Sequence, residues 1–188
     1  MKWEDAFELL KQHVQSESLI KHALSVEAAM AGYAGKWGED EELWSNTGLL
    51  HDIDYEKYPE THPVKGAEML KAYGFDASMT HAVLAHSDAT GTPRESRLDK
   101  TLYAVDELAG FIVACALVRP SRSFEDLEVK SVKKKLKDKA FAKAVDRDQI
   151  KQAADDLGVD MNDHLQDMIN FLRNREQILR GKNLSLID

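Results

Sequence analysis

Apolar residues recur along most of this chain at intervals of three and four positions, the spacing that gathers them on one face of a helix. The strict alternation typical of strands is nearly absent. One such stretch runs from Ser18 to about Tyr33, where Gly32 or Gly35 can end the helix. The longest apolar helix is predicted over about 98–118. The pattern therefore predicts an all-α protein.

Local start signals place the remaining helices. Asp40 and Asp76 are suited to accept hydrogen bonds from the first N–H groups of a helix, and Pro63 fits the first helical position. Ser123, followed three residues later by Asp126, resembles a capping box and predicts another helix there. The helices predicted from these signals and from the apolar spacing cover 40–50, 63–74, 76–86, 146–157 and 160–180.

Composition favours a single helical domain. The chain has 188 residues, 43% of them hydrophobic, which is enough for one substantial core and too few to require two. Only 10 glycines and 4 prolines interrupt it, and this balance favours helices over sheets. We therefore expect residues 1–188 to form one all-α domain, a helical bundle.

The charge of the chain limits its partners. A net charge of −8 argues against general nucleic-acid binding, which needs a clustered positive surface. One group of lysines is a local exception, and it is either a solvated helix face or an anion-binding patch. These residues are Lys130, Lys133, Lys134, Lys135, Lys137 and Lys139.

Targeting signals are not recognisable in the chain. Its first residues have neither the basic start nor the apolar run of a signal peptide, and no apolar stretch approaches the roughly 20 residues of a membrane span. Cys115 is the only cysteine and is expected to be a small buried hydrophobe. These features predict a cytoplasmic protein that does not bind membranes.

Asp106 is notable because it lies on the buried stripe of the long 98–118 helix. Burying an unpaired carboxylate costs several kcal/mol or forces its protonation, so Asp106 needs a partner. A bound cation, Arg97, Arg119 or a neighbouring hydroxyl group can each fill that role. This residue alone does not decide between a metal and a salt bridge.

Three further residues favour a metal. His22 lies near the start of the first long predicted helix, and His51 and Asp52 follow at the end of the next one. Together with Asp106 they supply two imidazoles and two carboxylates. This mixed nitrogen and oxygen set suits Mn, Fe, Co, Zn or Mg better than an ion that prefers thiolates.

The order of these residues also carries a family resemblance. An early histidine, a His-Asp doublet and a later aspartate follow one another on helices, here as His22, His51-Asp52 and Asp106. The local contexts are Gly-Leu-Leu-His-Asp-Ile-Asp at 48–54 and Ala-Val-Asp-Glu-Leu-Ala-Gly at 104–110. The chain thereby resembles the HD-domain superfamily of metal-dependent phosphohydrolases, in the form of an HDIG-like standalone HD domain.

The resemblance covers about residues 18–125 and implies an HD-type helical bundle, with C-terminal helices over 125–181 packing on it. Some branches of the superfamily hold two metals through two additional histidines, and His62 and His86 match those positions. Asp52 would then bridge the ions. The alternatives are helix-start capping for His62 and packing for His86. The implied cofactor is one or two divalent ions among Fe, Mn, Mg, Co, Ni and Zn.

The reaction implied by the resemblance is hydrolysis of a phosphorylated small molecule or nucleotide by attack of a metal-bound hydroxide. Asp52 would be catalytic through the metals. Asp54 and Glu56, in the polar loop after the doublet, are candidates for the acid that protonates the leaving oxygen. Many relatives carry lysine four residues after the histidine of the doublet, whereas this chain has Tyr55 there and Lys57 two positions later.

Three basic residues are candidates for contact with the substrate. They are Lys65, Arg119 and Arg122, and the two arginines lie where related proteins place a phosphate-binding arginine. Guanidinium groups suit phosphate oxygens because they donate paired hydrogen bonds. The alternative for the arginines is an exposed loop between helices.

Two other functions remain open at this stage. The same set of six ligands resembles that of inositol oxygenase, so one alternative is a di-iron oxygenase of this type. The other is a sensory HD module, which would bind a nucleotide without hydrolysing it. The long apolar helix also leaves room for a homodimer. The remaining histidines, His13, His81 and His164, are expected to be structural.

Overall fold

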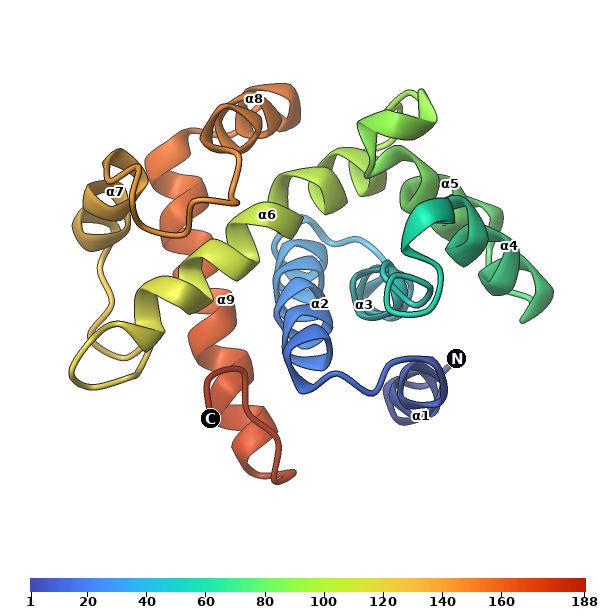
Figure 1. Ribbon diagram of the computed structural model, residues 1–188, viewed down its shortest axis with the longest axis horizontal. Coiled ribbons are helices and arrows are strands. Elements are labelled where there is room, and N and C mark those ends of the chain that lie inside the picture. The colour runs from blue at the N-terminus through green and yellow to red at the C-terminus, as the bar shows by residue number, and fades with distance from the viewer.

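The computed structural model describes all residues from 1 to 188 and contains no strand (Figure 1). The α-helices are α1 (Trp3–His13), α2 (Glu17–Trp37), α3 (Glu41–Leu50), α4 (Val64–Ala72), α5 (Ala77–Ala85), α6 (Arg97–Leu117), α7 (Val129–Lys137), α8 (Arg147–Leu157) and α9 (Met161–Arg180). Two short 3₁₀ turns, at Pro59–Thr61 and Asp88–Thr90, lie in the connections. The predicted all-α fold is confirmed.

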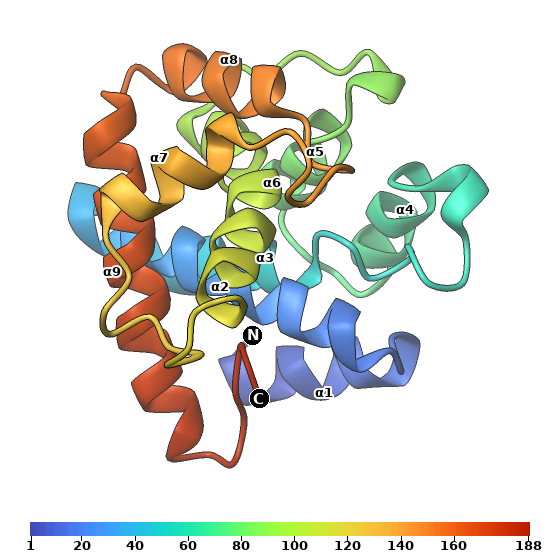
Figure 2. The ribbon, with the colours of Figure 1, turned by 60° about the vertical axis from the view of Figure 1, so that its left-hand side comes forward.

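The long helices α2 and α6 organise the molecule. Helix α3 packs along α2, and α6 crosses α2, with α5 against α6 and α4 against α5 (Figure 1). On the other side α7 and α8 each pack on α6 and on α9, and α9 also packs on α6 and α2 (Figure 2). One cluster of 42 buried hydrophobic residues runs from Ala6 to Ile187. The C-terminal helices are therefore built on the same core as the helices that precede them.

The contact between α2 and α3 is close because Gly48 has no side chain. A Cβ atom at Gly48 would lie 2.8 Å from the Cα of Glu27 in α2. The Glu27 carboxylate is fully buried. It accepts a hydrogen bond from Nε of Arg175 in α9 at 2.7 Å and another from the hydroxyl of Ser45 in α3 at 2.6 Å. Burial raises the pKa of Glu27, while Arg175 and Ser45 oppose that shift. One buried carboxylate thus joins three helices.

Helix α2 extends beyond the predicted end near Tyr33. Gly32 does not stop it, because this glycine lies inside the helix where a Cβ atom would collide with the ring of Phe171. The helix ends at Trp37, and Gly38 follows in the left-handed conformation with φ of 70°. Its N–H group donates to the carbonyl of Ala34, which closes the last turn.

Most of the predicted helix starts are confirmed. Asp40 and Asp76 accept hydrogen bonds from the first backbone N–H groups of α3 and α5. Pro63 directly precedes the first residue of α4 instead of occupying it. A capping box of Ser96 and Asp99, which the sequence analysis did not identify, begins α6.

The capping box predicted at Ser123 and Asp126 is wrong. The carboxylate of Asp126 is occupied by hydrogen bonds from Arg119 and Ser121, and the next helix starts only at Val129. Cys115 is buried, as expected. None of the helices is both long enough and apolar enough to span a membrane.

Candidate metal centre

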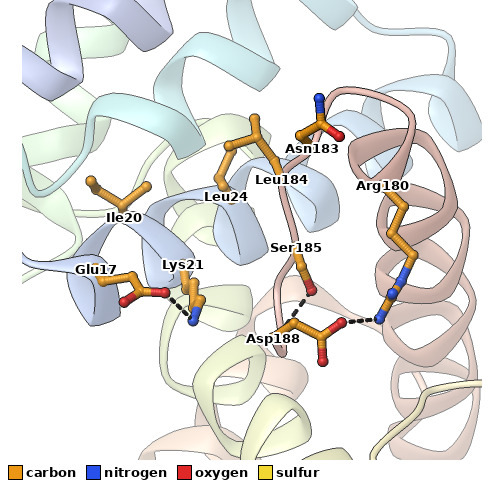
Figure 3. Close-up of a pocket in the computed structure, with 9 residues that line it drawn as sticks. All are labelled: Glu17, Ile20, Lys21, Leu24, Arg180, Asn183, Leu184, Ser185 and Asp188. Atoms are coloured by element: carbon orange, nitrogen blue, oxygen red, sulfur yellow. Dashed lines mark hydrogen bonds and ion pairs between the residues drawn. The ribbon is translucent and has the colours of Figure 1, made fainter.

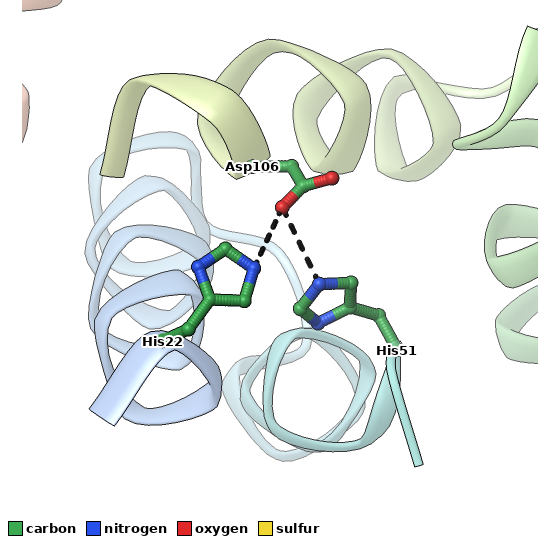
Figure 4. A group of neighbouring side chains, drawn as sticks. All are labelled: His22, His51 and Asp106. Atoms are coloured by element: carbon green, nitrogen blue, oxygen red, sulfur yellow. Dashed lines mark ion pairs between the residues drawn. The ribbon is translucent and has the colours of Figure 1, made fainter. Parts of the chain in front are cut away.

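The candidate metal centre lies where the middle of α6 meets the first turns of α2 and the C-terminal end of α3. His22 comes from the second turn of α2, His51 from the residue after α3, and Asp106 from the middle of α6. Figure 4 shows both imidazole rings directed at the same Asp106 oxygen. His22 Nε2 lies 2.9 Å and His51 Nε2 3.4 Å from Asp106 Oδ1. Residues separated by more than 80 positions therefore face one point.

Asp52 lies at the centre of the remaining ligands. Its Oδ1 atom is 3.4 Å from His51 Nε2 and 3.5 Å from the Nε2 atoms of both His62 and His86. Its Oδ2 atom is 3.7 Å from His22 Nε2. The structure thus brings all six predicted ligands together, with Asp52 in reach of every histidine among them.

These side chains form two overlapping groups of possible ligands. In one group His22, His51 and Asp106, and in the other His51, Asp52 and His86, offer atoms that all lie within 4.8 Å of one another. His62 adds a further nitrogen on the side of His86, since their rings are 5.2 Å apart. The two groups share His51, and together they offer enough ligand atoms for two divalent cations.

Hydrogen bonds outside the centre orient three of the rings. Nδ1 of His51 donates to the carbonyl of Gly48 at 2.8 Å, and Nδ1 of His86 donates to the carbonyl of Val83. His62 directs its Nδ1 to the Asp54 carboxylate at 2.8 Å. Because these oxygens only accept, the proton of each neutral ring resides on Nδ1, and the Nε2 lone pair faces inward.

His51 gives a direct test of whether a cation fits. Its Nε2 atom is buried and has no hydrogen-bond partner. A buried polar atom left without a partner is costly, and native structures rarely contain one without a specific reason. A divalent cation would bind this lone pair, so the residues present fit a metal.

The electrostatics of the centre also suit a cation. Burial opposes the charged forms of both aspartates, but the neighbouring histidines outweigh it and hold the pKa values of Asp52 and Asp106 below their usual range. Both carboxylates are therefore ionised at neutral pH. Burial likewise opposes protonation of His51 and His86, yet the nearby carboxylates raise their pKa values. The centre attracts positive charge, whether protons or metal ions.

Asp54 is not the exposed loop acid that the sequence suggested. It is fully buried, and its two oxygens accept hydrogen bonds from His62 Nδ1 and from the backbone N–H of Gly66 in α4, the latter at 2.7 Å. Gly66 allows this approach, because a Cβ atom there would lie 2.8 Å from Asp54 Oδ1. Asp54 therefore positions His62 and the start of α4, and has no oxygen free for a leaving group.

Replacing Asp54 by alanine is expected to weaken metal binding on the side of His62 and His86 by about 10–100-fold. Metal binding on the side of His22 and Asp106 should be unchanged. Titration of metal-free protein with Mn²⁺ or Co²⁺ measures both affinities. Glu56→Ala is the control, because Glu56 is exposed and accepts only from the backbone between α1 and α2. Equal losses in the two variants would contradict the positioning role.

Of the other residues that follow the doublet, Tyr55 lies beside the candidate ligands and Lys57 does not. Tyr55 is 44% exposed and its ring contacts the ring of His62 edge-on, with centroids 5.1 Å apart. Lys57 points away and donates to the carbonyl of Gln12. Lys65 lies in the first turn of α4, after His62, and its ammonium group pairs with Glu68. Lys65 thus remains a candidate for contact with a ligand.

The two arginines predicted to contact substrate lie elsewhere. Arg119 follows the end of α6, about 20 Å along the helix axis from Asp106, and its guanidinium forms two hydrogen bonds with Asp126. Arg122 lies three residues further, in the exposed loop before α7. The length of α6 thus carries both away from the metal centre. Arg97, weighed as a partner for Asp106, pairs with Glu39 instead.

The remaining histidines have structural partners. His164 is buried between Tyr33 and the carbonyl of Ala104. His13 contacts the hydroxyl of Tyr73, and His81 lies 3.2 Å from Asp99. None of the three joins the metal centre, as the sequence analysis expected.

Comparison with known proteins gives a family and a set of partial relatives. The sequence model of the HD-domain family matches residues 19–110 of this chain. Ribonuclease Y of Oleidesulfovibrio alaskensis is 32% identical over 99 residues, which are 50% of this chain and 18% of that protein. Ribonuclease Y of Lawsonia intracellularis is 30% identical over 117 residues, 60% of this chain and 21% of that protein.

A third relative is shorter. An uncharacterized protein of Methanocaldococcus jannaschii is 34% identical over 114 residues, 57% of this chain and 66% of that protein. The chain spans only about a fifth of the length of the ribonuclease Y proteins that it matches. No solved structure matches it significantly. The matched segment, residues 19–110, holds all six residues of the candidate metal centre, and this segment of the chain belongs to the HD-domain superfamily.

Proposed function

We propose that this protein is a metal-dependent phosphohydrolase that acts on a phosphorylated small molecule or a nucleotide. The observation that carries the proposal is that four imidazoles and two carboxylates meet at one place. All four histidines lie within 3.7 Å of Asp52, and Asp106 lies 3.4 Å from the buried Nε2 of His51, which has no hydrogen-bond partner. His22, His51, Asp52 and Asp106 would hold one divalent cation. Asp52, His62 and His86 would hold a second.

The bound cations would lower the pKa of a water molecule and neutralise charge on the transferring phosphoryl group. The protein contributes a fixed frame for that chemistry. Backbone carbonyls and Asp54 hold three rings with Nε2 inward, and the ionised Asp52 and Asp106 supply negative charge. Tyr55, exposed beside His62, is placed to meet a ligand that reaches the centre. The nitrogen and oxygen donors suit Mn, Fe, Co, Ni, Zn or Mg.

The direct test combines metal analysis with phosphate release. Protein purified without chelator is expected to contain near-stoichiometric divalent metal and to release phosphate from one class among phosphomonoesters, nucleotides and phosphoanhydrides. A chelator should abolish the release, and Mn²⁺, Fe²⁺, Co²⁺, Ni²⁺ or Mg²⁺ should restore it. Protein that holds no metal, and that none of these ions activates, would refute the proposal.

Two further measurements on the same protein test the alternative functions, a di-iron oxygenase and a sensory module. Consumption of oxygen with a polyol, without phosphate release, would identify a di-iron oxygenase. Tight nucleotide binding without any product after long incubation would identify a sensory module. Either result would replace hydrolysis as the function of the centre.

A phosphodiester in RNA is a second candidate substrate, and the similarity to ribonuclease Y favours it. The net charge of −8 favours small substrates instead, because a long RNA backbone is bound through clustered positive charge. End-labelled RNA oligonucleotides belong in the same panel. Cleavage of RNA without hydrolysis of small phosphates would select this candidate.

A further inference from the structure

A cavity separate from the metal centre lies between the C-terminal end of α6 and helix α7. Its volume is about 630 Å³, within the range of small-molecule binding sites. Cys115, Val118 and Leu127 contribute apolar surface, and Ser131 a hydroxyl. The charged side chains that line it are Arg119, Lys134, Lys135, Lys137 and Asp138.

The positive charge of this cavity is not neutralised by the protein. Lys134, Lys135 and Lys137 form no ion pair, and Asp138 is the single carboxylate in the lining. Arg119 is paired with Asp126, outside the cavity. Three lysines without a carboxylate partner therefore line one cavity in a chain whose net charge is −8, and one of them, Lys135, lies over the ring of Phe141. Like charges gathered at one place raise the local concentration of anions.

Lysines of the same helix that lie outside the cavity behave differently. Lys130 pairs with Glu128 at 2.7 Å, and Lys133 donates to Asn162 at 2.7 Å. The lysines of α7 thus differ: those outside the cavity have a carboxylate or amide oxygen as partner, whereas those that line it have no oxygen partner from a side chain. A uniformly solvated helix face would not show this division.

A second cavity provides a contrast. It lies beside the start of α2 and the end of the chain, and its charged groups pair among themselves (Figure 3). Lys21 lies 2.7 Å from Glu17, and Arg180 lies 2.6 Å from Asp188. The charges of this cavity are thus balanced by the protein itself, whereas those of the three lysines beside α7 are not balanced by a carboxylate partner.

The cavity beside α7 is also not an extension of the metal centre. Cys115 in its lining follows Asp106 by nine residues of one helix, which is about two and a half turns. The two side chains therefore lie on opposite faces of α6 and about 14 Å apart along its axis. A ligand in the cavity occupies a different face from a substrate at the metals.

We propose that the α6–α7 cavity is a second binding site, for a small molecule that carries two or more phosphate groups. Lys134, Lys135 and Lys137 bind the phosphates, and Val118 and Leu127 pack against any apolar part of the ligand. The shared chemistry is a compact polyphosphate, whether inorganic or attached to a nucleoside. Helix α6 then carries this second binding site on one face and Asp106 on the other.

Binding to metal-free protein tests this site without contribution from the metal centre. Calorimetric titration of chelator-treated full-length protein with sodium tripolyphosphate is expected to show one site per chain that weakens as salt rises. The double variant Lys134→Ala/Lys137→Ala should weaken it by at least about tenfold, because two charge-assisted contacts are lost. A nonhydrolysable ATP analogue that binds more tightly than tripolyphosphate would indicate a nucleotide ligand, and equal affinity would indicate recognition of the phosphates alone.

The matched control is Lys130→Ala/Lys133→Ala, which removes the same charge from the same helix outside the cavity. It should change the affinity by less than about twofold. Equal losses in the two double variants would show diffuse attraction and overturn the proposal. Binding of an RNA oligonucleotide without binding of either polyphosphate would overturn it as well. Because metal is absent throughout, these outcomes do not depend on whether the metal centre hydrolyses phosphates.

Discussion

The Asp52→Ala variant is expected to lose metal and phosphate release together, with a fall in rate of more than about a thousandfold. Asp52 is in reach of all four histidines of the centre, through Oδ1 for His51, His62 and His86 and through Oδ2 for His22. Its removal takes a ligand from both proposed ions at once. Metal content by mass spectrometry and the rate of phosphate release measure the two losses.

His62→Ala provides the contrast within the same centre. His62 approaches Asp52 Oδ1 but belongs to only one side of the arrangement, so this variant should lose one of the two ions and keep the other. An unchanged metal content and rate would show that the centre works with a single ion. The control for Asp52→Ala is Asp155→Ala, which removes an exposed carboxylate from α8. It should leave the metal content and the rate of phosphate release unchanged.

Arg175→Ala is expected to reduce the free energy of unfolding by about 3–5 kcal/mol. Arg175 is the cationic partner of the fully buried Glu27, and its loss leaves that carboxylate without its main compensation. Urea denaturation followed by circular dichroism measures the change. Glu27→Gln in the same chain should recover part of the loss, because a neutral amide is less costly to bury than an unpaired charge.

The control for Arg175 lies one and a half turns further along α9. Arg180 also pairs with carboxylates, the buried Glu176 and the exposed Asp188, but its own side chain is half exposed. Without Arg180, Glu176 still accepts hydrogen bonds from Ser185 and from the backbone N–H of Leu186. An exposed ion pair contributes about 0–1 kcal/mol, so Arg180→Ala should have a small effect. Similar effects of both substitutions would mean that the Glu27–Arg175 pair contributes no more than a surface pair.

The features that depend on local sequence were predictable. Capping by Asp40 and Asp76, and the placement of His22 and Asp106 on long amphipathic helices, follow from the side chains themselves and from the helical spacing. The six ligands could be named together because their order resembles a family pattern. Spacing alone did not decide whether Asp106 faces a metal or an arginine.

The errors come from contacts between distant segments. Gly32 continues α2 because Phe171, far along the chain, fills the space where its side chain would be. Asp54 is buried because Gly66 lets α4 approach it, so a polar loop position became a positioning residue. Arg119 was a candidate for contact with substrate, but it follows the end of α6, far along the helix from Asp106, and pairs with Asp126. The spacing of residues along the sequence does not reveal such contacts between distant segments.

Gly48 links the packing of the helices to the chemistry of the centre. Its missing side chain lets α3 approach the backbone of Glu27, and its carbonyl accepts the Nδ1 proton of His51. A larger residue there would push α3 outward and carry the imidazole with it. In a saturation mutagenesis screen this position should therefore be as intolerant as a true ligand, although it never touches the ions. The packing of the core thus holds the imidazole of His51 in place before any ligand binds.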